Sequence, residues 1–321
     1  MTIYTAIIGT GFAARKRVEA LREIPQVELV AVVSRSLERA QRFGQQHQIT
    51  ALNSSNELWG HPQLDLIVIC TVNADHGTLV QQALEHNKHV VVEYPLALNV
   101  EQAPQLVSLA RDRQRMLHVE HIELLGGLHL AMKHHMAAIG KPHYVNYRTF
   151  APQQPAPDKW SYHQKLLGFP LMAALSRIQR LTDLLGPVAH VTCQGMIAPL
   201  NSERFRRCLY SAQLQFCNGV LAELTYGKGE GLWQRSRCIE IRGDQGCLTF
   251  NGNQGCLVTA AGEQTIEAEP RQGLFQKDTL WVVDHLVTGK PLYVQPEESL
   301  YALQIAAALE RAVTLGERVT M

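Results

Sequence analysis

The feature that most constrains the fold is a glycine-rich turn near the start of the chain, with the sequence Gly9-Thr10-Gly11-Phe12-Ala13-Ala14. The turn follows an apolar run at 4–8 and precedes a stretch of helical periodicity, which is the context of a dinucleotide-binding fingerprint. Gly9 allows the tight turn, Gly11 lets the backbone approach a pyrophosphate, and Ala14 permits close packing of helix on strand. The alternative is a glycine-rich turn that binds no ligand. We predict a dinucleotide site, with the helix N-terminus facing the phosphates, formed by Gly9, Thr10, Gly11, Phe12 and Ala13.

Strand-like and helical segments alternate through the first 120 or so residues. The Val/Ile-rich runs are apolar on both faces, which is typical of central strands in a parallel sheet covered by helices. Right-handed crossovers then make the sheet doubly wound. We therefore predict an α/β Rossmann domain over residues 1–122. The expected strands are 4–8, 27–33, 64–70, 89–93 and 116–120, and the expected helices are 15–23, 37–46, 78–87 and 101–113.

The pattern changes after residue 122, where several strand-like segments are separated by turn signals such as Asn-Gly and Gly-Asp. Such a density of strands and turns predicts an α+β domain over residues 123–321, with a large open and mostly antiparallel sheet. A final amphipathic helix at about 297–315 is the candidate to pack back towards the Rossmann domain. The expected strands are 143–150, 188–197, 208–216, 220–226, 236–242 and 247–250, with helices at 126–139 and 170–185.

Charge and composition exclude several classes of function. Lys and Arg number 30 against 29 Asp and Glu, so no strong field favours nucleic acid or a membrane surface. Apolar stretches such as 66–70 are far shorter than the roughly 20 residues that cross a bilayer. No signal peptide precedes the first strand, so we expect a cytoplasmic protein. The seven cysteines form no C-x-x-C pair and the 14 histidines do not converge, so we predict buried thiols and no metal site.

The residues after the second strand predict which dinucleotide is bound. Enzymes that use NAD usually present a carboxylate there, but this chain reads Ser34-Arg35-Ser36. Two hydroxyls and a guanidinium would bind the 2′-phosphate that a carboxylate would repel. We therefore predict that Ser34, Arg35 and Ser36 select NADPH over NADH. In the alternative, Ser34 caps the next helix and Arg35 points into solvent.

Three sequence motifs together resemble those of the glucose-fructose oxidoreductase and inositol dehydrogenase family (Gfo/Idh/MocA). They are the glycine-rich turn, the run from Thr71 to His76, and the run from Lys88 to Leu98, and the resemblance extends over most of the chain. It implies an NAD(P)H-dependent oxidoreductase that acts on a small molecule. It also implies that the cofactor cleft includes Thr71, Val72, Asn73, His76, Glu93 and Tyr94. Glu93 is expected to bind the nicotinamide ribose or local backbone, or alternatively to be a structural carboxylate at a strand end.

One departure from the family lies at Glu93-Tyr94-Pro95, where most members read Glu-Lys-Pro. The family lysine touches the substrate hydroxyl, so its replacement argues against alcohol oxidation. Tyr94 is expected at the nicotinamide edge, where it would contact both cofactor and substrate. Its role would be to tune catalysis, because a phenol with a pKa near 10 is a slow acid. Alternatively it packs against Pro95, which is often preceded by a cis peptide bond in this family.

A second departure lies on the family's substrate helix, whose aspartates and histidine fall here on Ala173, Arg177 and Arg180. Arginine cannot accept or release a proton usefully at neutral pH, so the helix suits an anionic substrate that accepts hydride. Arg177 and Arg180 are three apart and share one face. We predict that both bind substrate and that Arg177 is the more essential, orienting the substrate and easing its protonation through water. The alternative is a solvated basic face.

Two further groups of residues are weaker candidates. His121 lies between Glu120 and Glu123 after the sixth strand, where it could contact substrate, but a lone histidine is more often structural. The basic run 15–17 could approach the phosphates, although we expect a solvated helix face there.

We therefore predict an enzyme that reduces a small anionic molecule with NADPH. Two alternatives stay open: a reductase in the same family that acts on an imine or keto substrate, and a catalytically silent NADPH-sensing regulator. The open sheet allows either a homodimer or a monomer.

Overall fold

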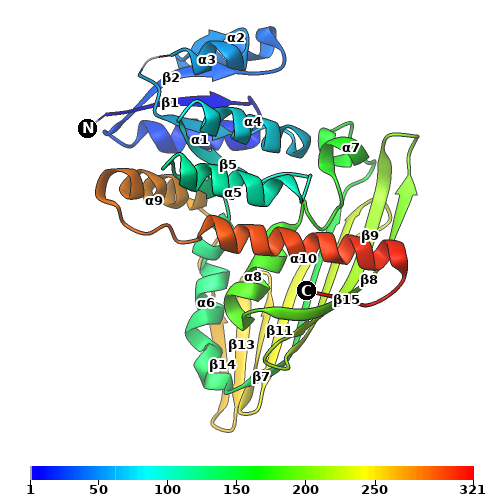
Figure 1. The fold of residues 1–321 in the computed structure, drawn as a ribbon. Helices are drawn as coiled ribbons and strands as arrows, with labels where there is room; N and C mark the ends of the chain where they lie inside the picture. Colours follow the sequence, from blue (N-terminus) through cyan, green and yellow to red (C-terminus); the bar gives the residue numbers. More distant parts are fainter. Residues whose placement is uncertain (1, 62) are drawn as a thin grey trace. The chain divides into compact units, whose positions relative to one another are not determined.

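A computed structural model of the chain describes residues 2–61 and 63–321 and divides into two compact units (Figure 1). Unit 1 comprises Met1–Ile122 and Gly273–Tyr301, and unit 2 comprises Glu123–Gln272 and Ala302–Met321. Residues 273–301 thus group with the N-terminal segment, whereas the sequence places them in the second domain. The reason is that Val282 and Val283 pack into the core of unit 1 beside the strands of its sheet.

The sheet of unit 1 has six parallel strands in the order β3-β2-β1-β4-β5-β6. The order reverses between β1 and β4, which is the switch point where doubly wound sheets bind nucleotides. The predicted Rossmann fold is confirmed, and β3 is the one strand of this sheet that the sequence analysis lacks. The strands are β1 (Ile3–Ile8), β2 (Val27–Val33), β3 (Thr50–Leu52), β4 (Leu66–Ile69), β5 (His89–Val92) and β6 (Leu117–Val119).

Helices cover this sheet and contribute side chains to the hydrophobic core of unit 1. The apolar faces of α1 and α2 bury Val18, Leu21 and Phe43 against the strands. Four of these helices, α1, α2, α4 and α5, match helices predicted in the first 120 residues, but α3 and α9 were not predicted; α9 comes from the late segment. The helices are α1 (Phe12–Arg22), α2 (Leu37–His47), α3 (Ser55–Trp59), α4 (Asn73–Glu85), α5 (Gln102–Asp112) and α9 (Leu274–Thr288); α10 (Pro296–Leu315) begins in unit 1 and continues into unit 2.

Unit 2 is built on a nine-stranded sheet in the order β14-β13-β12-β11-β7-β10-β9-β8-β15. Its one parallel pair is β7 with β10, so the predicted open and mostly antiparallel sheet is confirmed. The strands are β7 (Pro142–Pro152), β8 (Val188–Pro199), β9 (Phe205–Phe216), β10 (Leu221–Gly229), β11 (Ser236–Gly243), β12 (Gly246–Asn251), β13 (Gln254–Thr259), β14 (Gly262–Glu267) and β15 (Val319–Thr320).

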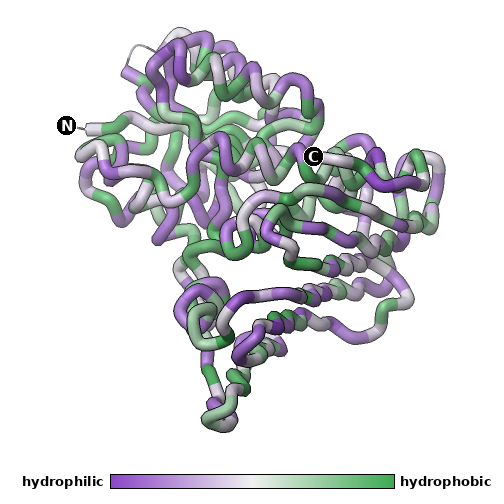
Figure 2. Tube along the Cα trace, turned by 60° about the horizontal axis from the view of Figure 1, so that its bottom comes forward, coloured by the Kyte–Doolittle hydropathy of each residue, from purple (hydrophilic) through white to green (hydrophobic). Residues whose placement is uncertain are grey.

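The strands of unit 2 alternate in polarity, as Figure 2 shows along the tube. In β7, Val145 and Tyr147 are buried while Arg148 is exposed, so one face of the sheet is covered and the other is polar. The covered face carries the longest helix that lies wholly in unit 2, α8. The helical segments here are η1 (Ile122–Leu125, which starts at the unit boundary), α6 (Gly127–His135), η2 (Met136–Ile139), η3 (Trp160–Tyr162), α7 (Gln164–Leu167) and α8 (Leu175–Leu185). Among residues 2–61 and 63–321, none of the helices has the length and apolar character needed to cross a membrane.

Candidate active site

The glycine-rich turn has the geometry that a pyrophosphate requires. Gly9 has φ +123°, and a Cβ there would lie 2.3 Å from the carbonyl oxygen of Cys70, so only glycine fits. Gly11 is the N-cap of α1, where no side chain of the described residues accepts from the free backbone N–H groups. Apart from the adjacent residues of the chain, no described residue places an atom within 4 Å of a Cβ built on Gly11. The turn therefore leaves open space and unused donors at a helix N-terminus, as an anion needs.

The residues after β2 lie at the surface. Strand β2 is the neighbour of β1, the strand that leads into the glycine-rich turn. The Arg35 side chain is 64% exposed, and its Nε lies 3.9 Å from the Asp75 carboxylate. Ser36, not Ser34, is the N-cap of α2, because its Oγ accepts from the backbone N–H of Arg39 at 3.3 Å. Arg35 is thus exposed, as the alternative held, but that exposure also leaves it accessible to a ligand phosphate.

The segment after β4 contacts the Tyr94–Pro95 turn. Asn73 and His76 lie in the first turn of α4 and are buried, while Thr71 and Val72 precede the helix. His76 Nδ1 lies 2.8 Å from the carbonyl oxygen of Pro95, and because a carbonyl only accepts, Nδ1 carries the proton. Burial lowers the pKa of His76, which keeps the ring neutral. The Tyr94-Pro95 peptide bond is cis, as expected.

Arg17 corrects one expectation, because the predicted solvated face of 15–17 holds only for Arg15 and Lys16. The Arg17 side chain is 1% exposed and lies on the same helix face as Ala14, Val18 and Leu21. Its Nε and Nη2 donate to Glu93 at 3.2 and 3.0 Å, and its Nη1 pairs with Asp278 of α9. Glu93 therefore has a protein partner for one oxygen, Oε1, which the sequence did not reveal.

Asp278 collects several donors in the interior of unit 1. Its Oδ1 lies 2.8 Å from His118 Nε2 and accepts from the Tyr293 hydroxyl at 2.5 Å. Burial opposes ionisation, but Arg17 and His118 outweigh it and hold the pKa of Asp278 below its usual value. Burial and repulsion by Glu93 and Asp278 raise the pKa of Glu120 well above its usual value. The surroundings therefore favour ionisation of Asp278 and oppose ionisation of Glu120.

His121 supports Tyr94 from within the protein. The two rings are stacked, with centroids 5.6 Å apart and planes inclined by 9°. His121 is fully buried, and its Nε2 lies 2.9 Å from the Ser299 hydroxyl. Burial lowers its pKa to about 3, so the ring is neutral at physiological pH. These contacts favour the structural role that the sequence analysis kept as the alternative, while Tyr94 itself is half-buried.

Arg177 is held over the covered face of the sheet in unit 2. Leu175, Ile178 and Leu181 form the buried stripe of α8, which ends at Gly186 with φ +86°. Arg177 Nε donates to the Thr149 hydroxyl at 2.9 Å, and its guanidinium carbon lies 5.0 Å from the centroid of the Tyr226 ring. The side chain is half-buried, so the solvated basic face is wrong for this residue.

Arg180 has a different environment on the same helix. Its side chain is 2% exposed, with Nη1 donating to the Tyr147 hydroxyl at 2.6 Å and Nη2 lying 3.2 Å from Glu123 Oε2. Burial opposes ionisation of Glu123, but Arg180 and Arg271 lower its pKa below the usual value. A protein carboxylate therefore already neutralises Arg180. Its predicted contact with substrate stays a prediction, whereas a solvated position is wrong.

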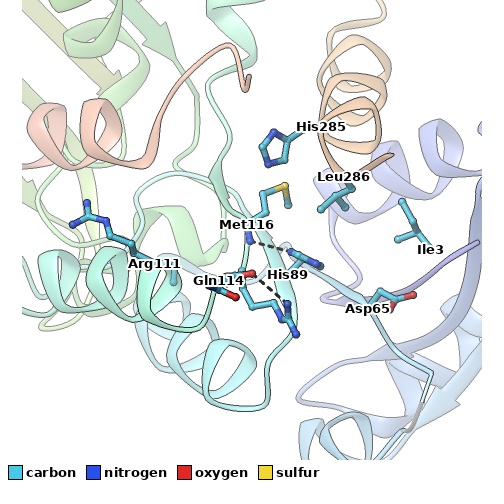
Figure 3. Close-up of a pocket in the computed structure, with 10 residues that line it drawn as sticks. Ile3, Asp65, His89, Arg111, Gln114, Met116, His285 and Leu286 are labelled. Carbon is cyan, nitrogen blue, oxygen red and sulfur yellow. Dashed lines mark hydrogen bonds between the residues drawn. The ribbon is translucent and has the colours of Figure 1, made fainter. Parts of the chain in front are cut away.

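A cavity of about 390 Å³ lies elsewhere in unit 1 and does not belong to this site (Figure 3). His89 begins β5 and Ile3 begins β1, so the cavity lies where strands start, whereas the glycine-rich turn lies where β1 ends. His89 Nδ1 accepts from the backbone N–H of Met116 at 2.9 Å. The lining residues are Ile3, Asp65, His89, Ala110, Arg111, Gln114, Arg115, Met116, His285 and Leu286.

The fold and the phosphate-fitting turn together define a nicotinamide-dependent oxidoreductase. The family model "Oxidoreductase family, NAD-binding Rossmann fold" matches residues 3–121, and "Oxidoreductase family, C-terminal alpha/beta domain" matches residues 136–321. The chain therefore belongs to the Gfo/Idh/MocA family and is an NAD(P)H-dependent oxidoreductase. The resemblance seen in the sequence is confirmed.

The chain is also similar to individual proteins. A crystal structure of biliverdin reductase from Synechocystis sp. PCC 6803, in complex with biliverdin and NADP+, is 44% identical, with a TM-score of 0.94; the match covers 97% of this chain and 99% of that one. Mouse biliverdin reductase A is 26% identical over 311 residues, which are 95% of this chain and 94% of the mouse protein. A probable dehydrogenase from Thermotoga maritima, at 18% identity and a TM-score of 0.81 over 99% of this chain and 98% of its own, shows the fold alone.

The sequence itself also points within the family to the cyanobacterial type of biliverdin reductase. The phrases are Glu93-Tyr94-Pro95, the run from Leu117 to Leu125, and Ala174-Leu175-Ser176-Arg177 ahead of Leu184-Leu185-Gly186. The similarity to the Synechocystis enzyme bears out this resemblance. Several residues that contact the candidate site residues were not assigned from the sequence: Thr149, Tyr226, Glu123, Arg17 and Asp278. Alternation along the strands could have placed Thr149 and Tyr226 on the covered face.

Proposed function

We propose that this protein reduces biliverdin IXα to bilirubin with NADPH, by hydride transfer to the central methine carbon. The observation that carries the proposal is the 44% identity, over 97% of the chain, to a biliverdin reductase whose crystal structure holds biliverdin and NADP+. The absence of the family's lysine at Tyr94 and of its histidine at Arg177 supports it, because reduction of a pigment needs no base for a hydroxyl.

Arg177 is the residue that we assign to the bilin. Biliverdin is a flat conjugated tetrapyrrole with two propionates, so it needs an apolar surface, cations and a proton for a pyrrolic nitrogen. The guanidinium is always charged and cannot itself give up a proton at neutral pH. Its Nε is fixed by Thr149 and its plane lies near Tyr226, which leaves a preorganised cation for the substrate. In this proposal Arg177 orients the bilin and holds the water that protonates it.

The N-terminal unit would hold the cofactor, which supplies the hydride when bound. The backbone of the Gly9–Ala13 turn would contact the pyrophosphate, and Ser34, Arg35 and Ser36 would contact the 2′-phosphate. Tyr94 would lie at the nicotinamide, kept in place by the stacked His121 and by the Pro95 carbonyl contact to His76. Since its phenol is a slow acid, Tyr94 tunes the reaction rather than supplying the essential proton.

Visible absorbance tests the function directly. Biliverdin IXα is mixed with the protein and NADPH, and NADH is used in parallel. We expect the red band of biliverdin to fall while the yellow band of bilirubin grows. A protein that oxidises NADPH with imine or keto substrates but leaves biliverdin unchanged would instead favour the second reductase, and no turnover with any of them would favour the regulator.

Arg177→Ala then tests the assigned residue. We expect kcat/KM for biliverdin to fall by roughly a hundredfold or more, the scale on which one preorganised donor acts, with NADPH binding retained. Arg148→Ala is the matched control, because Arg148 is exposed on the opposite face of the same strand as Thr149. Activity that survives in Arg177→Ala at the level of the control would remove Arg177 from the mechanism.

A further inference from the structure

We infer that Lys228 forms a carboxylate-binding subsite on the same sheet face as Arg177, an inference that rests on the proposed function. Lys228 lies in β10 two residues after Tyr226, so both side chains point to the covered face. Tyr226 is the ring beneath the Arg177 guanidinium. Two residues of a strand span about 7 Å, so the two cations lie along one short stretch of the sheet.

The ammonium group of Lys228 uses only part of its bonding capacity within the protein. Its Nζ donates to the carbonyl oxygen of Ser161 at 2.7 Å and lies 4.3 Å from the centroid of the Tyr162 ring. An ammonium has three donors, and the carbonyl takes one of them. Among residues 2–61 and 63–321, no carboxylate forms an ion pair with Lys228.

The two side chains that lie against Lys228, Cys208 and Tyr162, supply no negative charge. Cys208 is directly opposite on β9, and burial raises the pKa of its thiol to about 12. Burial likewise raises the pKa of the Tyr162 phenol to about 12. Both groups are therefore neutral at pH 7, and the nearby Lys159 adds a further positive charge. Burial, assisted by Lys159, lowers the pKa of Lys228 to about 8, so most of the ammonium is still charged at neutral pH.

A partly buried cation without a counter-charge is costly, and the two arginines that are almost fully buried among the described residues are both paired. Arg180 is paired with Glu123, and Arg17 is paired with both Glu93 and Asp278. The missing charge at Lys228 is best supplied by an anion on the ligand. A molecule with two carboxylates would place one near Arg177 and the other on Lys228, with the Tyr162 ring beside it.

The test compares two ligands that share a chromophore but differ in charge: biliverdin IXα and its dimethyl ester, in which both propionates are neutral. Their affinities are measured by absorbance titration without NADPH, and their KM values with it. The variants are Lys228→Met, the charge-preserving Lys228→Arg, and Lys165→Met as a control that removes an exposed lysine from α7. Circular dichroism and NADPH affinity report that each variant is folded.

We expect Lys228→Met to weaken biliverdin binding by roughly tenfold or more, as loss of a charge-assisted contact does, and to leave the ester unaffected. Lys228→Arg should retain most of the affinity and Lys165→Met all of it. Equal weakening of both ligands would assign Lys228 to packing alone and overturn the subsite, as would unchanged affinity for both. Wild-type protein that neither binds nor reduces biliverdin would overturn the proposed function, and the bilin subsite with it.

Discussion

Arg35 is the residue on which the choice between the two nicotinamide cofactors depends. It is exposed, and its contact to Asp75 at 3.9 Å is long and screened by solvent. A phosphate bound to Arg35 would therefore displace only this weak contact to Asp75. Ser36 has a second task, because its hydroxyl caps α2. The guanidinium of Arg35 thus carries most of the predicted selectivity.

Replacing Arg35 with alanine should raise KM for NADPH and leave KM for NADH nearly unchanged. A charge-assisted hydrogen bond contributes about 1.5–3 kcal/mol, so the loss should be roughly tenfold to a hundredfold. Steady-state kinetics with both cofactors measure it, and Arg39→Ala, an exposed arginine on α2, is the control. An NADPH preference that persists in Arg35→Ala would show that other groups read the 2′-phosphate.

The pairing of α1 with α9 is the main element-level feature of the N-terminal unit. Arg17 from α1 meets Asp278 and Thr279 from α9, and Glu93 after β5 completes the set. Removal of one partner from a buried ion pair leaves the other charge uncompensated, which costs far more than the pair itself contributes.

Arg17→Met should therefore lower the free energy of unfolding by about 3–5 kcal/mol. Urea denaturation followed by circular dichroism measures the change. Arg15→Met removes an exposed arginine two residues earlier on the same helix and should change stability by less than about 0.5 kcal/mol. Similar small effects in both variants would contradict the assigned role of Arg17.

These elements also show what the sequence could reveal. Five strands of the parallel sheet were predictable because each is a short run of branched apolar residues. Helix α9 was not predictable, because its apolar residues are not confined to one face. Leu274, Val282 and Val283 are buried, but Leu280 is exposed, so the helix has no separate polar face. In β14 only Ile266 is buried, which leaves a strand with almost no apolar signal.

The local geometry of the candidate site was predictable where it depends on backbone, as at Gly9. The role of Arg177 stays a prediction. The local geometry was not predictable where a partner comes from a distant segment. The inward turn of Arg17 depends on Asp278, 261 residues later. The neutralised state of Arg180 depends on Glu123 in a separate short helix. Spacing along one helix cannot distinguish a buried arginine from a solvated one.

Across the whole molecule, several histidines are held neutral, which determines how stability depends on pH. Burial lowers the pKa of His89 from 6.5 to about 4, and burial also lowers the pKa values of His76, His121 and His129. In each case the unfolded chain binds the proton more readily than the folded one. The stability that these histidines contribute is therefore fully present above pH 6.5 and is lost as the pH falls below it.

For His89 the loss should occur between about pH 6.5 and 4, where the unfolded state is protonated and the folded state is not. His89→Asn keeps an acceptor for the Met116 N–H but cannot be protonated, so its unfolding midpoint should fall less steeply over that interval. Urea titrations at a series of pH values measure this, with the exposed His134→Asn as the control. Parallel pH profiles for His89→Asn and wild type would rule His89 out as a source of acid sensitivity.

The discontinuous make-up of unit 1 has a consequence for biosynthesis. A ribosome must translate the whole of 123–272 before α9 emerges, so the nascent Rossmann segment waits with Arg17 lacking its partner Asp278 and with part of its core uncovered. At about 5–20 residues per second, that delay is on the order of ten seconds. A fragment cut after residue 122 would remain in this unfinished condition, and chaperones have the same interval in which to bind it.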